Sequence, residues 1–279
     1  MVVLVESSAG GDALKPDSVG VVTVATNRYV DYWHAMALSA DVHLFPDREV
    51  VLHVFTDRLP DIRAMVSDFS NVIVNPLPID ALGWPEATLL RYEVFDSYRS
   101  DLEQRLLMHL DADMLLVDDV GLELHPADWP NGIALVRHPG FRRPDGRDGL
   151  ALYAKSPVLV AKDAVRRVRV GGLGTWETDP GSRAFVPRRK RETYVCGGTW
   201  FGLREPFRAM VGELATRTRA DLKEGRIAVW HDESHLNWFA ANHRTALLGS
   251  EYCYAAGFSN VDDLTPKIVA VDQPDGRTR

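Results

Sequence analysis

A short apolar run that ends in two carboxylates constrains this chain more than any other feature. Leu106–Leu110 is followed directly by Asp111, Ala112 and Asp113. Such a run is typical of a strand buried in a sheet, and ligands of open α/β sheets gather at the carboxyl ends of the strands. Two carboxylates at that edge suit Mg²⁺ or Mn²⁺ and leave coordination positions for the phosphate oxygens of a nucleotide. The alternative is an ordinary strand-to-turn junction, because Asp is common in turns.

Strand and helix patterns alternate through the first half of the chain. Apolar, β-branched runs predict strands at residues 19–25, 50–55, 72–74, 106–110 and 133–136. Apolar residues at helical spacing predict helices at 29–44 (Trp33, Ala37, Ala40, Leu44) and at 86–98 (Leu90, Val94, Tyr98). This alternation favours a doubly wound, mainly parallel sheet in one α/β domain. We expect a single domain over 1–272, with a nucleotide-binding half at 19–136, an acceptor and catalytic half at 137–272, and a disordered tail at 273–279.

Composition excludes several classes of protein. The chain has 279 residues and a net charge of -7, which argues against a general nucleic-acid binder. Cys196 and Cys253 are the two cysteines, too few for a disulfide framework or a thiolate zinc cluster. The sequence has no signal-peptide pattern and no apolar run of the roughly 20 residues that a transmembrane span needs. We therefore expect a cytoplasmic protein without a transmembrane segment.

The middle of this acidic chain is strongly basic. Residues 137–191 contain 14 Lys and Arg against 5 Asp and Glu. Most of these side chains are explained by a solvated surface. The alternative is an electropositive rim that attracts a nucleotide diphosphate, an acidic glycan or a lipid surface. Residues 188–191, Arg-Arg-Lys-Arg, are the best candidate for a mobile segment that faces phosphate.

A second dense motif is found at residues 230–237, Trp-His-Asp-Glu-Ser-His-Leu-Asn. It is too polar for an amphipathic surface helix, and a polar helix start with capping residues is one interpretation. His231 and His235 would share a helix face, as metal ligands do, but the Glu position of the H-E-x-x-H zinc motif is absent. Glycosyl transfer fits better, because Glu233 could face an oxocarbenium-like anomeric carbon. Asp232 and His231 would then hold sugar hydroxyls, and Trp230 would give an apolar wall for the sugar.

These motifs together resemble glycosyltransferase family 6, the family of the histo-blood-group A and B transferases and the α-1,3-galactosyltransferase. Residues 230–237 match the family signature without a change, and His138-Pro139-Gly140-Phe141 resembles its acceptor-side motif. The resemblance covers about residues 20–254 and is closest to bacterial-type members, which lack the family's membrane anchor. The matching motifs lie, in chain order, at 111–114, 120–124, 138–141, 175–187, 194–198 and 230–237.

The resemblance implies a GT-A fold, in which a Rossmann-like, mainly parallel sheet flanked by helices carries an acceptor-side extension. It implies a retaining glycosyltransferase that moves GalNAc or Gal from a UDP-sugar to a galactose-containing glycan, fucosylated or not, in α-1,3 linkage. The cofactor would be Mn²⁺, with Mg²⁺ as the alternative, and the acceptor an oligosaccharide or a glycolipid. The basic stretch at 137–191 could contact a membrane peripherally, or it could close over the donor.

The resemblance also assigns site residues. Glu233 is the catalytic residue beneath the anomeric carbon, either as a covalent nucleophile or as a stabiliser of front-face transfer. Asp111 and Asp113 are the metal ligands. The donor-binding residues are Ala25, Thr26, Tyr29, Trp84, Arg91, Asp111, Ala112, Asp113, Gly197, Gly198, His231 and Asp232. The acceptor-binding residues are His138, Thr175, Trp230 and Glu233.

Two glycines bear on the choice of donor. In the blood-group enzymes, small residues at the positions that match Gly140 and Gly198 accompany UDP-GalNAc and larger residues accompany UDP-Gal. Both positions are Gly here, which favours UDP-GalNAc, because an N-acetyl group needs the volume that a side chain would fill. Gly198 could instead serve only the backbone of a Gly-Gly pair. A larger residue is typical of the family at the position of Cys196.

The chain departs from the family in two places that concern the acceptor. Residues 142–174 form an insertion relative to the blood-group enzymes, and Ala255 occupies the position of an acceptor-contacting Asp. Two other functions remain as alternatives: a non-catalytic sugar-nucleotide or glycan-binding protein, and a metal-dependent sugar-nucleotide hydrolase. Intact Asp111, Asp113 and Glu233 argue against the binding protein, and the acceptor-side motif argues against the hydrolase.

Overall fold

The computed structural model describes residues 17–143, 146–255 and 264–271. The strands are β1 Val19–Val24, β2 Val50–Thr56, β3 Val72–Pro78, β4 Leu106–Leu110, β5 Met114–Leu116, β6 Ile133–Arg137, β7 Val195–Leu203, β8 Ala246–Leu248 and β9 Ile268–Ala270. The helices are α1 Tyr29–His43, α2 Leu59–Met65, α3 Glu86–Leu89, α4 Arg91–Ser97, α5 Gly146–Lys155, α6 Pro157–Arg169, α7 Arg204–Lys223 and α8 His231–Asn242. Short 3₁₀ turns are found at Val66–Asp68, Pro126–Asp128, Pro130–Gly132, Pro139–Phe141, Arg188–Lys190 and Ser250–Cys253.

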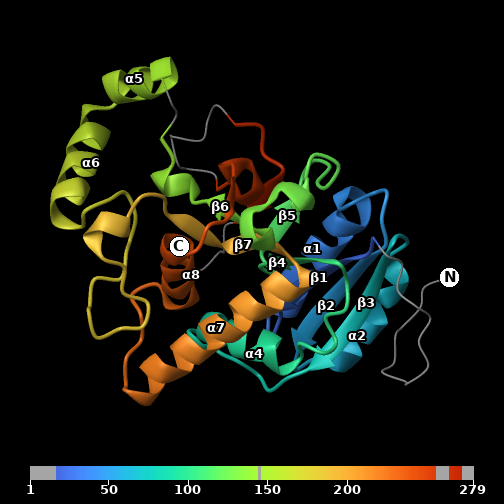
Figure 1. Ribbon diagram of the computed structural model, residues 1–279. Coiled ribbons are helices and arrows are strands. Elements are labelled where there is room, and N and C mark those ends of the chain that lie inside the picture. The colour runs from blue at the N-terminus through green and yellow to red at the C-terminus, as the bar shows by residue number, and fades with distance from the viewer. Residues whose placement is uncertain (1–16, 144–145, 256–263, 272–279) are drawn as a thin grey trace.

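A seven-stranded sheet in the order β3-β2-β1-β4-β7-β6-β8 forms the centre of the molecule (Figure 1). The first four strands of that order run parallel, β7 runs antiparallel to both of its neighbours, and β6 is parallel to β8. This mostly parallel sheet flanked by helices confirms the predicted α/β class. The expected tail at 273–279 lies outside the described residues.

Both faces of the sheet are buried, which explains the nearly continuous apolar strands. On one face, Val21 of β1 belongs to the same core as Trp33 of α1. On the other face, Val22 lies in a second core with Phe95 of α4 and Leu214 of α7. Alternate residues of a strand point to opposite faces, so each strand contributes to both cores. The helices that cover the second face therefore also determine which side chains meet at the end of β4.

The predicted helix at residues 86–98 is divided at Leu90, whose φ of -97° and ψ of 2° lie outside the helical region. Leu89, Tyr92 and Phe95 are fully buried, whereas Val94 and Tyr98 of the predicted stripe are partly buried and pack against the same core. The change of direction places Arg91 at the start of α4 with its side chain buried. By contrast, the predicted stripe of α1 is confirmed, with all four of its residues buried.

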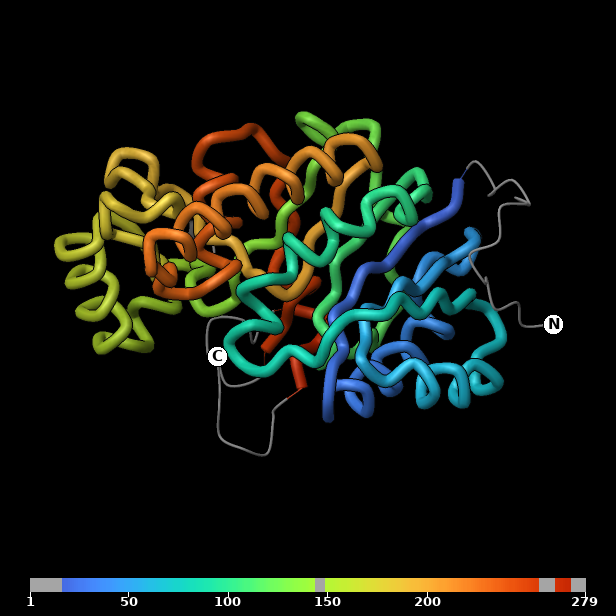
Figure 2. Tube along the Cα trace, turned by 90° about the horizontal axis from the view of Figure 1, so that it is seen from below, coloured from blue at the N-terminus to red at the C-terminus, as the bar shows by residue number. Residues whose placement is uncertain are grey.

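One end of the molecule carries α5 and α6, which project from the sheet side by side with the segment before β7 (Figures 1 and 2). They occupy most of the predicted insertion at 142–174. None of the helices in the described ranges combines the length and the apolar character that crossing a bilayer requires.

A buried histidine on β2 makes stability depend on pH. His53 is completely satisfied as a neutral ring, because its Nε2 donates to Gln104 Oε1 at 2.8 Å and its Nδ1 accepts from Asn75 Nδ2 at 3.0 Å. Burial lowers the pKa of His53 from 6.5 to about 4. The unfolded chain takes up this proton near pH 6.5 and the folded chain only near pH 4. The folded state therefore loses stability as pH falls through that window.

We expect the His53 shift to cost about 3 kcal/mol of unfolding free energy between pH 6.5 and pH 4. Urea unfolding at a series of pH values measures the slope. A His53→Gln variant should have a shallower slope by that amount, whereas His125→Gln, at an exposed position, should keep the slope of the original chain. Equal slopes for the two variants would contradict the assignment.

Candidate active site

The carboxylates that follow β4 lie at its carboxyl end, as the sequence predicted. Asp111 and Asp113 are 7% and 4% exposed, and the backbone N–H of Asp111 donates to the Gly198 carbonyl at 3.0 Å. Ala112 between them is also buried. The end of β4 is thereby joined to β7, so the carboxylates and the Gly197-Gly198 pair occupy one edge of the sheet.

Arg91 connects these carboxylates to the start of α8. Its Nη1 lies 2.8 Å from Asp111 Oδ1 and its Nε lies 3.3 Å from Asp232 Oδ2. Nη1 also donates to the Gly197 carbonyl at 3.3 Å. The guanidinium is 6% exposed, so it balances two carboxylates that are largely shielded from water. Predicted donor-site residues from four separate segments therefore meet at one cation.

His109 belongs to this cluster and was not predicted. Its Nδ1 donates to the Val22 carbonyl at 3.0 Å, and its Nε2 accepts from Arg91 Nη1 at 2.7 Å. Burial and the positive charge of Arg91 lower the pKa of His109, so the ring is neutral and can accept that bond. The signal in the sequence was that His109 is the one polar residue within the apolar run 106–110.

Glu233 is held by the backbone of β7. The Gly197 N–H donates to Glu233 Oε2 at 2.9 Å. The Asn237 side chain, one turn further along α8, exchanges 2.8 Å bonds with the N–H and the carbonyl of Val195. A Cβ on Gly197 would lie 3.3 Å from both Asp232 Oδ2 and Glu233 Cβ, which is tight. Glycine at this position lets α8 approach the strand closely.

The motif at 230–237 forms the buried start of α8 rather than a solvated surface helix. The metal-pair interpretation of its histidines is not supported. The His231 ring contacts Trp84 at a centroid distance of 5.5 Å, whereas His235 is buried with its Nε2 3.7 Å from Asp221 Oδ2. Within the described ranges, no group of three or more His, Cys, Asp or Glu side chains is arranged to hold a metal ion.

Tyr194 brings the predicted acceptor-side residues together. Its hydroxyl accepts from Thr175 Oγ1 at 2.9 Å, and its ring lies 5.6 Å from that of His138. Burial and then the charge of Glu233 raise the pKa of Tyr194 well above its usual value, so the phenol stays protonated beside that carboxylate. Tyr194 was part of a recognised motif but was not predicted as a site residue. The structure thus links His138 and Thr175 to Glu233 through one side chain.

The remaining predicted residues lie on the loops around this edge. Ala25 is buried after β1, Thr26 Oγ1 donates to the Leu82 carbonyl at 2.8 Å, and Tyr29 begins α1. Trp84 and Trp230 are 64% and 40% exposed, so both present an indole to solvent. An exposed indole is a surface on which a sugar or a base can pack.

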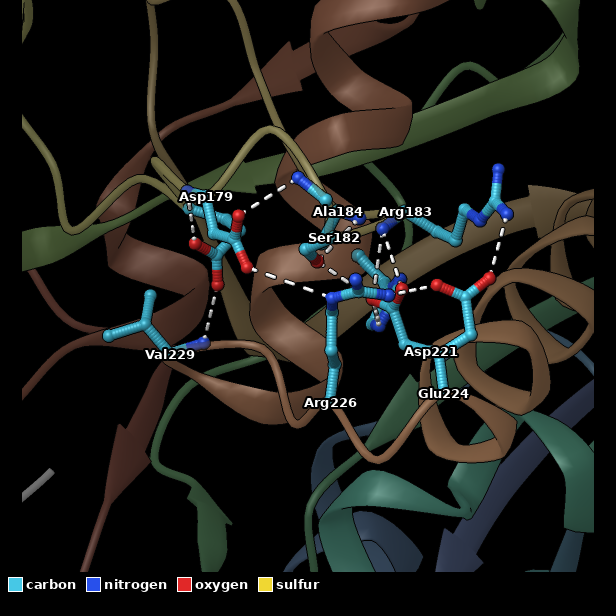
Figure 3. Close-up of polar contacts among 11 residues, drawn as sticks. Asp179, Ser182, Arg183, Ala184, Asp221, Glu224, Arg226 and Val229 are labelled. Carbon is cyan, nitrogen blue, oxygen red and sulfur yellow. Dashed lines mark hydrogen bonds and ion pairs between the residues drawn. The ribbon is translucent and has the colours of Figure 1, made fainter.

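A network of carboxylates joins the segment at 177–184 to the end of α7 and to the segment before α8 (Figure 3). Glu177 accepts from the Asp179 N–H at 2.8 Å and from the Val229 N–H at 2.9 Å. Asp221, at the end of α7, accepts from Ser182 Oγ and from the Arg183 N–H, both at 2.7 Å. The segment after Thr175 and the segment before Trp230 are therefore tied to each other and to α7.

The basic segment at 188–191 makes structural contacts that the sequence did not predict. Arg191 is 7% exposed, and its guanidinium donates to the carbonyls of Val186 and Val170. Arg188 likewise donates to the Val168 carbonyl at the end of α6, and Lys190 Nζ donates to Asn242 Oδ1 at 2.6 Å. Three of the four cations therefore bond to backbone carbonyls and to a side chain at the end of α8, whereas Arg189 is exposed.

Comparison with known proteins agrees with this arrangement. The family description Glycosyltransferase family 6 matches residues 172–274. Histo-blood group ABO system transferase 1 of Rattus norvegicus is 26% identical over 245 residues, which cover 86% of this chain and 62% of that protein. The O-antigen biosynthesis glycosyltransferase WbnI of Escherichia coli is 22% identical over 256 residues, covering 91% and 94%.

A third relative is the globoside alpha-1,3-N-acetylgalactosaminyltransferase 1 of Gallus gallus, 24% identical over 258 residues, which cover 90% of this chain and 63% of that protein. The chain thus spans less than two thirds of the length of the rat and chicken relatives and nearly the whole length of the bacterial one. With the motifs in this order around one sheet edge, the chain is similar to glycosyltransferase family 6, whose model matches residues 172–274, and to relatives that are named as glycosyltransferases.

Proposed function

We propose that the protein is a retaining, metal-dependent glycosyltransferase that moves GalNAc, or alternatively Gal, from a UDP-sugar to a galactose-containing glycan in α-1,3 linkage. The observation that carries the proposal is the meeting of Asp111, Arg91, Asp232 and Glu233 at the carboxyl edge of the sheet. The names of the relatives support it, because they are transferases of the ABO system, of globoside and of O-antigen biosynthesis. The acceptor would be an oligosaccharide or a glycolipid.

Each residue has a proposed task in this reaction. Glu233, whose carboxylate is oriented by the Gly197 N–H, would lie beneath the anomeric carbon and stabilise its developing positive charge. Asp232, oriented by Arg91, would accept hydrogen bonds from donor-sugar hydroxyls. His138, Thr175 and Trp230 would position the acceptor hydroxyl. The protonated Tyr194 would hold Glu233 from the acceptor side.

The donor set at the end of β4 fits a hard divalent cation. Asp111 and Asp113 supply carboxylate oxygens, and Mg²⁺ and Mn²⁺ are commonly held by one or two carboxylates together with substrate phosphates. Such a cation would neutralise the departing diphosphate. Arg91 already balances Asp111, so that carboxylate would not face the diphosphate as an uncompensated charge.

UDP release with UDP-GalNAc and UDP-Gal, each with Mn²⁺ or EDTA and with or without 2′-fucosyllactose, tests the proposal. We expect Mn²⁺-dependent release that favours UDP-GalNAc and increases with the acceptor. Release that favours UDP-Gal would support the galactosyltransferase alternative. Metal-dependent release that acceptor does not increase would favour a hydrolase, and UDP binding without release would favour a binding protein.

Asp113→Asn is expected to weaken Mn²⁺-dependent binding of UDP by at least about tenfold, because an amide oxygen carries no negative charge for the cation. Titration calorimetry with UDP in Mn²⁺ and in EDTA separates the metal-dependent part. Asp128→Asn, on the exposed turn Pro126–Asp128, is the matched control and should bind as the original chain does. Unchanged affinity of the Asp113 variant would exclude it as a metal ligand.

Gly198→Ala is expected to lower the ratio of turnover with UDP-GalNAc to turnover with UDP-Gal by about tenfold. The added methyl group would take volume from the N-acetyl group, and overpacking of this kind costs about 1–3 kcal/mol. Parallel assays with the two donors give the ratio. Gly212→Ala, within α7, should leave the ratio unchanged. A ratio that stays constant in Gly198→Ala would show that this glycine does not select the donor.

A further inference from the structure

The helix α6 has a fixed orientation on the acceptor side of the molecule. Its Asp163 is 2% exposed and accepts two 2.6 Å bonds from the Arg143 guanidinium and one at 3.0 Å from the Tyr153 hydroxyl. Arg166 lies over the Phe141 ring at 4.7 Å. These contacts determine which face of α6 is turned inward, so the opposite face is turned to solvent.

That outward face carries an apolar stripe. Val158, Ala161, Val165 and Val168 follow each other at intervals of three, four and three residues, which places them in one row along the helix. The three valines are 63%, 50% and 75% exposed, and Ala161 is exposed as well. A helix on a globular protein normally turns its apolar stripe to the core, so the arrangement here is inverted.

Basic side chains border the stripe on both edges. At 100° per residue, Lys162 and Arg169 lie along one edge, and Arg167 lies on the other side, beyond the exposed Val160 and Ala164, which widen the apolar surface there. All three cations are exposed. Over residues 149–169 the single acidic residue is Asp163, which faces inward and is paired with Arg143. The outward face is therefore positive on a chain whose net charge is -7.

We propose that this outer face of α6, composed of Val158, Ala161, Lys162, Val165, Arg167, Val168 and Arg169, is a peripheral membrane-binding surface for anionic lipids. A helix with an apolar row and flanking Lys and Arg lies in the plane of the interface, with the apolar row among the acyl chains and the cations at the headgroups. The charge argues against a second copy of the chain on this face, because two such faces would bring like charges together.

Membrane binding through α6 would also position the acceptor side of the candidate site. Phe141, which Arg166 covers, also lies 4.8 Å from the His138 ring at the acceptor side of the candidate site. Docking of α6 on a bilayer would hold that side near the membrane, where the glycan of a lipid-linked acceptor is found. This consequence rests on the proposed function, whereas the lipid binding itself does not.

The experiment is cosedimentation of the full chain with vesicles of phosphatidylcholine alone or mixed with phosphatidylglycerol. We expect binding to the mixed vesicles, little binding to phosphatidylcholine alone, and weakening at high NaCl. The triple variant K162Q/R167Q/R169Q should reduce the partition constant about a hundredfold, at about fivefold for each cation. The variant V158N/V165N/V168N should reduce it about tenfold or more.

Matched controls use exposed residues elsewhere: R99Q/R105Q/R219Q for charge and V42N for an exposed valine on α1. Both should bind vesicles as the original chain does, and thermal unfolding of every variant checks the fold. Equal loss in the charge control would attribute binding to unspecific positive charge and overturn the proposal. The absence of binding to the mixed vesicles would also overturn the proposal. So would a valine variant that binds vesicles unchanged but is a monomer by light scattering where the original chain is a dimer.

Discussion

Replacing Glu233 by Gln is expected to lower the rate of sugar transfer by about 10³-fold or more while UDP still binds. The amide oxygen can accept the Gly197 N–H as the carboxylate does at 2.9 Å, so the side chain should keep its place. What disappears is the negative charge beneath the developing cation at the anomeric carbon, and a single preorganised electrostatic contact of this kind is worth about 10²–10³ in rate or more.

UDP release with acceptor and calorimetric binding of UDP give the two readouts for Glu233→Gln. The matched control is Glu205→Gln on the exposed first turn of α7, where the side chain is 72% exposed and far along the chain from the motif. It should be as active as the original chain. Full activity of Glu233→Gln would remove Glu233 from the chemistry, and loss of UDP binding together with activity would indicate a role in donor binding instead.

Arg91→Met is expected to cost about 3–5 kcal/mol of unfolding free energy, the largest stability effect of any substitution discussed for this protein. The variant keeps most of the side-chain volume but leaves Asp111 and Asp232, each 8% exposed at the side chain, without their shared cation. His109 also loses the donor to its Nε2. An unpaired buried charge is far more costly than a missing surface ion pair.

Urea unfolding in EDTA at pH 7 and at pH 5 tests this expectation. Without Arg91 the pKa values of the two carboxyl groups should rise, so protonation at the lower pH should recover part of the lost stability relative to the original chain. Arg99→Met is the control, because its guanidinium is 56% exposed and 3.9 Å from Asp96, and it should cost less than about 1 kcal/mol. A similar small loss for Arg91→Met would mean that the carboxylates find other partners.

Local patterns in the sequence predicted the elements whose burial follows a simple period. β1, β2, β4 and α1 were correct within a residue or two, because their apolar residues recur at the spacing of the element they form. β7 escaped prediction because Gly197, Gly198 and Gly202 interrupt it and glycine is unfavourable in an isolated strand. Its place between β4 and β6 depends on pairing with partners distant in the chain.

The same division holds for the candidate site. The sequence by itself showed the resemblance to glycosyltransferase family 6, the carboxylates after β4 and the motif at the start of α8, because residue types at fixed spacing identify them. Only the tertiary structure decided that Arg91 lies between Asp111 and Asp232, that His109 is the neutral acceptor behind it, and that Tyr194 joins Glu233 to Thr175. Periodicity shows that α6 has an apolar row, but the Arg143–Asp163 pair decides that this row faces outward. Such choices depend on contacts between residues far apart in the chain, whose energies no local pattern contains.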